Sequence, residues 1–85
     1  MNKERFMGEK IFIIKNRLGL HARAAAQVVQ TANHFRSEIT LEREGVAVNG
    51  KSIMGILMLA APQGSRIRVA AEGEDAERAL TAIGQ

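Results

Sequence analysis

The chain has 85 residues, of which 46% are hydrophobic and 25% charged, and twelve Lys and Arg against nine Asp and Glu give a formal net charge of +3. This size allows one modest core and excludes a second domain or a deeply enclosed catalytic cleft. The absence of cysteine excludes disulfides, thiolate metal sites and cysteine nucleophiles. We therefore expect one domain over residues 1–85, with residues 1–9 as a flexible N-terminal extension.

The sequence has no long apolar segment of the kind that a membrane span or an export signal needs. No apolar run approaches the length that spans a bilayer, and the first eight residues lack the apolar stretch of a signal peptide. We therefore expect a cytoplasmic protein without membrane insertion. Its mild positive charge suits acidic partner proteins and is not a nucleic-acid signature by itself.

The first half of the chain predicts a strand, a helix and a hairpin. Residues 10–15 form a short β-branched apolar run, which predicts a strand. From residue 22 to about residue 35, apolar side chains recur at helical spacing. Residues 37–43 then alternate between apolar and polar, and a turn at Glu44 and Gly45 leads into residues 46–48, which predicts a hairpin.

The second half predicts a helix, a strand and a final helix. The pattern changes period again from residue 52 to about residue 60, and residues 66–70 alternate two arginines with Ile67 and Val69. A last helix follows the acidic pair at residues 74–75, which suits a helix N-terminus. The order is β-α-β-β-α-β-α, and strands with one charged face predict an α+β fold: a four-stranded antiparallel sheet with three helices on one face.

The most informative segment is residues 19–23, which read Gly-Leu-His-Ala-Arg where a strand has ended and an alanine-rich helix begins. A helix N-terminus offers unpaired backbone N–H groups to an anion. Arg23 adds a positively charged guanidinium, whose N–H donors suit phosphate oxygens. We therefore predict that His21 carries a phosphoryl group, held by Arg23 and by the backbone of Ala22 and Ala24. The alternative is that His21 merely caps the helix.

Residues 19–23, followed about thirty residues later by Lys-Ser-Ile-Met-Gly at residues 51–55, resemble HPr, the histidine-containing phosphocarrier family of the bacterial phosphoenolpyruvate:sugar phosphotransferase system. The resemblance covers about residues 10–83. It implies an open-faced β-sandwich and a monomer, phosphorylated on His21 by Enzyme I, that passes the group to sugar-specific acceptor proteins. The family usually has proline after the arginine, where this chain has Ala24.

The helix predicted from residue 52 is apolar around nearly its whole circumference, so a domain this small must leave part of it exposed. Exposed apolar side chains beside a reactive histidine indicate a docking surface. By its match to the family, this surface for Enzyme I and the acceptors includes Leu20, Lys51, Ile53, Met54 and Leu57. The alternative is that these side chains are core, and we expect this for Ile56 and Leu59.

Ser52 precedes a predicted helix, where a serine ordinarily serves as an N-cap. The resemblance implies a second role, because the matching family serine is regulatory and is phosphorylated by an HPr serine kinase/phosphorylase in some bacterial lineages. It also implies that Ser52 lies close to His21. His34 has no phosphate-binding neighbour in the sequence, and we interpret it as an ordinary exposed side chain.

Other classes of function fit less well. The chain lacks paired carboxylates in a cleft, a nucleophile with its base, and a metal set, so we expect a substrate protein in a relay that needs no metal or organic cofactor. An RNA-binding module needs stacking aromatics, and only Phe6, Phe12 and Phe35 are present. A regulatory protein that docks partners without efficient phosphotransfer stays open as an alternative.

Overall fold

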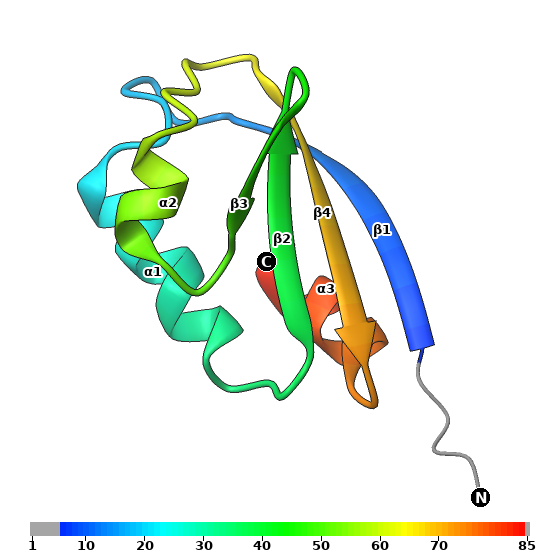
Figure 1. The fold of residues 1–85 in the computed structure, drawn as a ribbon. Helices are drawn as coiled ribbons and strands as arrows, with labels where there is room; N and C mark the ends of the chain where they lie inside the picture. Colours follow the sequence, from blue (N-terminus) through cyan, green and yellow to red (C-terminus); the bar gives the residue numbers. More distant parts are fainter. Residues whose placement is uncertain (1–5, 85) are drawn as a thin grey trace, which may run out of the picture.

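A computed structural model describes residues 6–84 of the protein, which form a four-stranded sheet and three helices (Figure 1). The observed order confirms the predicted β-α-β-β-α-β-α arrangement and the α+β class. The elements are β1 (Phe6–Ile13), α1 (Ala22–Ala32), β2 (Glu38–Arg43), β3 (Val46–Asn49), α2 (Ile53–Leu57), β4 (Arg66–Gly73) and α3 (Ala76–Ile83).

The sheet has the strand order β1-β4-β2-β3, and every neighbouring pair is antiparallel. Side chains alternate across it: Ile67 and Val69 are 2% exposed, whereas Arg66 and Arg68, which alternate with them along β4, face solvent. The buried face meets the helices, because α3 contacts β1 and β4, and α1 contacts both α2 and α3. The charged second face that the sequence predicts is therefore present, and the helices cover the other face.

Strand β1 begins at Phe6, four residues earlier than the start predicted at Lys10. The reason is its partner, since β4 continues to Gly73 and pairs with β1 over eight residues, from Phe6 opposite Gly73 to Ile13 opposite Arg66. Residues 6–9 therefore belong to the sheet and not to a flexible extension, and the expectation is wrong for them. Residues 1–5 of the expected extension lie outside the described residues.

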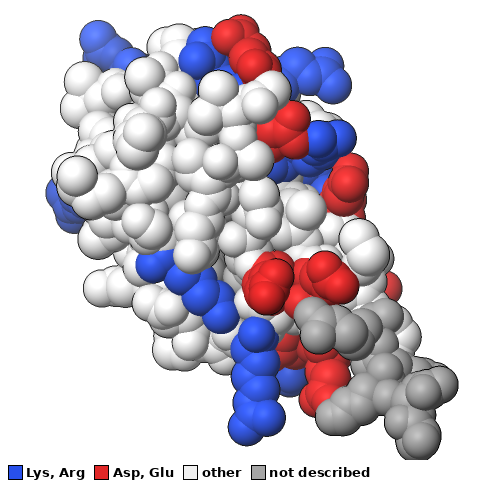
Figure 2. All heavy atoms as spheres, in the orientation of Figure 1, with Lys and Arg blue, Asp and Glu red and all other residues white. Residues whose placement is uncertain are grey.

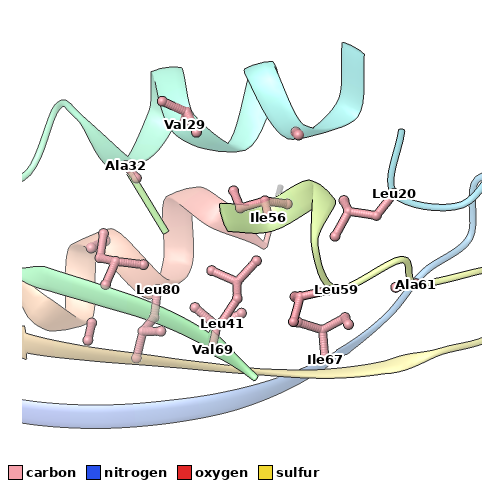
Figure 3. Close-up of a cluster of buried hydrophobic side chains, with 14 of the residues drawn as sticks. Leu20, Val29, Ala32, Leu41, Ile56, Leu59, Ala61, Ile67, Val69 and Leu80 are labelled. Atoms are coloured by element: carbon pink, nitrogen blue, oxygen red, sulfur yellow. The ribbon is translucent and has the colours of Figure 1, made fainter. Parts of the chain in front are cut away.

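The core lies between the sheet and the helices, and Figure 3 shows its side chains converging from all three helices and from the strands. Helix α1 ends at Ala32 and not near Phe35 as predicted, because the chain turns after Asn33. Phe35 still packs against the core from that turn. Burial of this kind contributes roughly 1.5–3 kcal/mol for each large apolar side chain, and it is what fixes α1 and α2 against the sheet.

A polar clamp formed by Ser37 and Asp75 joins the end of the turn after α1 to the start of α3. Ser37 is 1% exposed, and its hydroxyl and backbone N–H both donate to the Asp75 carboxylate, at 2.5 and 3.0 Å. The N–H of Arg36 donates to the second carboxylate oxygen at 2.9 Å. The hydroxyl of Ser37, followed by the N–H of Arg36, lowers the pKa of Asp75 to about 2, because these donors stabilise its ionised form.

Candidate phosphoryl-acceptor site

The loop before α1 is held in place by the segment that follows α2. Gly19 has a φ of +73°, which favours glycine, and a Cβ there would overlap the carbonyl oxygen of Ala61. The next N–H, that of Leu20, donates to the same Ala61 carbonyl at 2.8 Å, and Gly64 donates to Ile14 at 2.8 Å. Figure 1 shows these two segments side by side at one end of the sheet. The start of α1 is therefore set by backbone contacts on both sides of the loop.

His21 is the N-cap residue of α1 by its backbone, but its side chain makes no capping hydrogen bond. The ring is half-buried, and its Nε2 atom lies 3.2 Å from Nδ2 of Asn16. The interpretation of His21 as a side chain that merely caps the helix is therefore wrong. Sequence reasoning missed Asn16, which gives no signal beyond its place in a loop.

The first turn of α1 presents backbone donors without a competing anion. The carbonyl of His21 accepts the first intrahelical bond from Ala25 at 2.8 Å, so the N–H groups of the three residues between them have no helical acceptor. The first turn contains no acidic residue. The predicted phosphate-binding backbone at Ala22 and Ala24 is therefore part of an N-terminus that can accept an anion.

Arg23 lies in this first turn and its side chain is exposed. Within residues 6–84, no carboxylate lies within ion-pair distance of its guanidinium. The side chain can therefore bring its charge to an anion at the helix start without breaking an existing ion pair. Its place fits the role that the sequence predicts for it.

Leu20 does not belong to the docking surface. It is 9% exposed, and Figure 3 shows it among the core side chains near Ile56 and Leu59. Its neighbour His21 faces outward because Leu20 anchors the loop in the core. The prediction of Leu20 as a partner-binding residue is wrong for its side chain, since a motif places a residue next to a site without saying which way it points.

Helix α2 exposes one side and buries the other. Ile53 and Met54 are 40% and 73% exposed, as expected of a docking surface, while Ile56 and Leu59 are buried in the core as predicted. Leu57 is half-buried and packs against the core. Figure 2 shows that the surface over α2 is almost free of charged side chains.

Two further exposed apolar residues were missed. Met58 is 74% exposed, and it lies four residues after Met54, a spacing that places both on the same side of a helix and would have identified it. Leu18 is 78% exposed in the loop before His21. No periodic pattern marks Leu18, so only the structure identifies it.

Ser52 caps α2, because its hydroxyl accepts the N–H of Gly55 at 3.0 Å. The preceding Lys51 donates from Nζ to the carbonyl of Phe35 at 2.7 Å. Phe35 follows the C-terminal end of α1, so this bond ties the residue before α2 to the turn after α1. That Ser52 lies close to His21 stays a prediction.

Residues 6–84 also bear on metal binding, membrane crossing and RNA binding. No cluster of three His, Asp or Glu that could hold a metal occurs in residues 6–84, and none of the helices there is long and apolar enough to cross a bilayer. Phe6 and Phe12 point to the helix side of β1 by their pairing with Gly73 and Ile67, and Phe35 packs on the core. The open face of the sheet therefore has no aromatic platform for RNA bases.

Residues 9–85 match the family model described as the PTS HPr component phosphorylation site. The chain belongs to the HPr family. The phosphocarrier protein HPr of Xylella fastidiosa strain 9a5c is 51% identical over 79 residues, which cover 93% of this chain and 89% of that one. The HPr-like protein Crh of Halalkalibacterium halodurans is 48% identical over 77 residues, 91% and 92% of the two chains.

Solved structures agree with this assignment. The crystal structure of the phosphocarrier protein HPr from Bacillus anthracis superposes with a TM-score of 0.86 at 47% identity, and the match covers 92% of this chain and 93% of that one. The protein is thus an HPr-type phosphocarrier of the phosphotransferase system, with the open-faced sandwich of that family, and its partners are components of that system.

Proposed function

We propose that His21 is the residue that accepts the phosphoryl group, with phosphorylated Enzyme I as donor and sugar-specific proteins as acceptors. The observation that carries this proposal is the position of the ring. Its Nε2 atom is engaged by Asn16, which leaves Nδ1 for bond formation. Nδ1 is the ring nitrogen nearer the backbone, and His21 directly precedes the first turn of α1, whose N–H groups have no helical acceptor.

The transfer is a displacement at phosphorus. Because Nε2 accepts from Asn16, the neutral ring carries its proton on Nδ1. Nδ1 releases this proton to solvent, the electron pair left on Nδ1 forms the N–P bond, and the bond from phosphorus to the donor breaks with its electron pair kept by the donor. The N–H groups of Ala22 and Ala24 and the guanidinium of Arg23 stabilise the charge on the phosphoryl oxygens. This chain is a substrate of the relay, and the proposed step needs no metal or organic cofactor on it.

The exposed apolar side of α2 is the proposed docking surface. Ile53 and Met54 supply it together with the partly buried Leu57, and Lys51 supplies positive charge at its edge. Met58, four residues after Met54, adds a further exposed apolar side chain. Flexible methionine side chains suit a surface that must fit several partners in turn. The carrier acts as a cytoplasmic monomer in this proposal.

Ser52 is proposed as a regulatory site for an HPr serine kinase/phosphorylase. Its hydroxyl is half-buried, and it lies next to Ile53 and Met54. A phosphate on Ser52 places charge at the rim of an apolar docking surface, where it must lose water when a partner binds. Regulation in this proposal acts on docking.

The test is incubation with phosphoenolpyruvate and Enzyme I, followed by intact mass measurement. We expect an acid-labile gain of one phosphoryl group, its loss in His21→Ala, and its retention in the matched control His34→Ala. Arg23→Ala should accept the group more slowly, by about tenfold to a hundredfold, since one charged donor is lost. No gain in the unmodified protein would instead favour a regulatory docking role, which the similarity to a Crh protein makes the second candidate.

A further inference from the structure

The side chain of Asn16 is held in one orientation by the loop itself. Its Oδ1 atom accepts the N–H of Leu18 at 3.3 Å, and its Nδ2 atom lies 3.2 Å from Nε2 of His21. Rotating the amide by half a turn would set its NH₂ group against the N–H of Leu18, donor against donor. The amide therefore presents a donor, and not an acceptor, to His21.

A donor at this position requires that Nε2 of His21 carries no proton, since only the bare nitrogen can accept a hydrogen bond. We infer that Asn16 is a positioning residue that keeps Nε2 of phosphorylated His21 unprotonated and thereby protects the phosphoryl group from water. This inference rests on the proposed function of His21, with the phosphoryl group on Nδ1.

The chemistry of phosphoryl loss explains the protection. When water attacks phosphorus, the N–P bond breaks and its electron pair returns to Nδ1, while the water oxygen forms the new bond to phosphorus. If Nε2 is already protonated, the departing group is neutral imidazole. If Nε2 is bare, the departing group is an imidazolate anion, which is a far poorer leaving group. A hydrogen bond that stabilises bare Nε2 therefore slows hydrolysis of the carrier between its partners.

Two substitutions separate the contact with His21 from the support of the loop. Asn16→Asp keeps an oxygen for the N–H of Leu18 but places an anionic acceptor against Nε2, which favours the protonated ring. Asn16→Ala removes both contacts. The matched control is Asn33→Ala, because Asn33 is an exposed asparagine at the other end of α1.

Each variant is loaded with phosphoenolpyruvate and Enzyme I, separated from the enzyme, and followed by intact mass at neutral pH. We expect Asn16→Ala to lose its phosphoryl group about two- to tenfold faster than the control, the factor that one neutral hydrogen bond supports. Asn16→Asp should lose it more than about tenfold faster, since its contact is charge-assisted. If both Asn16 variants lose the phosphoryl group at the rate of the control, the inference is overturned.

A spectroscopic measurement distinguishes this role from a general loosening of the loop. Nitrogen-15 shifts of the His21 ring should show Nε2 unprotonated in the protein without a substitution and protonated in Asn16→Asp. A general loosening of the loop would leave the protonation of Nε2 unchanged. Unchanged ring nitrogens in Asn16→Asp would contradict the proposed contact. Failure of the unmodified protein to load at all would contradict the proposed function of His21, and the ring-nitrogen measurement would still test the contact.

Discussion

Gly19 lies directly against Ala61: a Cβ on Gly19 would overlap the carbonyl oxygen that holds the N–H of Leu20. This contact sets the loop two residues before His21. His21, the proposed acceptor, is therefore positioned by a segment distant in the sequence, and the position of Gly19 cannot hold a side chain without moving that loop.

The first prediction is that Gly19→Ala destabilises the protein by about 2–4 kcal/mol and slows phosphoryl acceptance, because it combines a positive φ with a backbone clash. Chemical denaturation and the loading assay measure the two effects. The control is Gly64→Ala, where φ is +91° but a Cβ meets nothing within 4 Å. It should cost only about 1–2 kcal/mol and load normally. Equal costs for the two variants would rule out the clash.

Replacing Ala24 with proline tests the departure of this chain from its family. The N–H of Ala24 has no helical acceptor, so Ala24→Pro removes no helical hydrogen bond, and it should stabilise the fold by about 0.4–1 kcal/mol through the unfolded chain. Ala26→Pro is the control. It lies inside α1, and it should cost about 3 kcal/mol. A fall in melting temperature for Ala24→Pro would mean that the first turn does not accept proline here.

The proposed regulatory role of Ser52 predicts a difference between two substitutions. Ser52→Ala should cost about 1 kcal/mol as a lost cap yet load nearly normally. Ser52→Asp keeps a capping oxygen but adds charge beside Met54, and it should slow loading by Enzyme I severalfold. Thr81→Asp adds the same charge on α3 and serves as control. If Ser52→Asp and Thr81→Asp load equally fast, charge at the docking surface has no effect and only the cap remains.

The clamp of Ser37 and Asp75 predicts an acid-sensitive part of the stability. The pKa of Asp75 is lowered to about 2 in the folded protein, so its contribution is complete above the ordinary carboxyl pKa near 4 and is lost as the pH falls toward 2. Asp75→Asn should lower the free energy of unfolding by about 1.5–3 kcal/mol at pH 7. The gap to the unmodified protein should close between about pH 4 and pH 2. A gap that is constant with pH would show that the carboxylate charge is not what the clamp uses.

The strands and helices could be predicted because their signals are local. Alternation in residues 66–70 and helical spacing from residue 22 both report on one buried face, and the structure places Ile67, Val69 and Ala25 in the core accordingly. The ends of the elements could not be predicted, because they depend on partners. Residues 6–9 join β1 only because β4 continues to Gly73 opposite them.

The candidate site also has features that local sequence predicts and features that depend on distant contacts. His21 and Arg23 were predicted because a strand end followed by a helix start is visible in the sequence. The burial of Leu20 and the contact of Asn16 with His21 depend on a loop conformation that Ala61 imposes from a distance.

The strand order β1-β4-β2-β3 also governs how the protein can assemble. Among the strands of residues 6–84, β4 is made last and joins β1 to β2, so before it is made the β2–β3 hairpin is the only one of the described pairings open to the chain. An isolated hairpin is marginal in water, and pairing β1 with β4 closes a loop over most of the chain. The sheet therefore forms late during synthesis and in one cooperative step, and an incomplete nascent chain is not yet a competitor for phosphoryl groups.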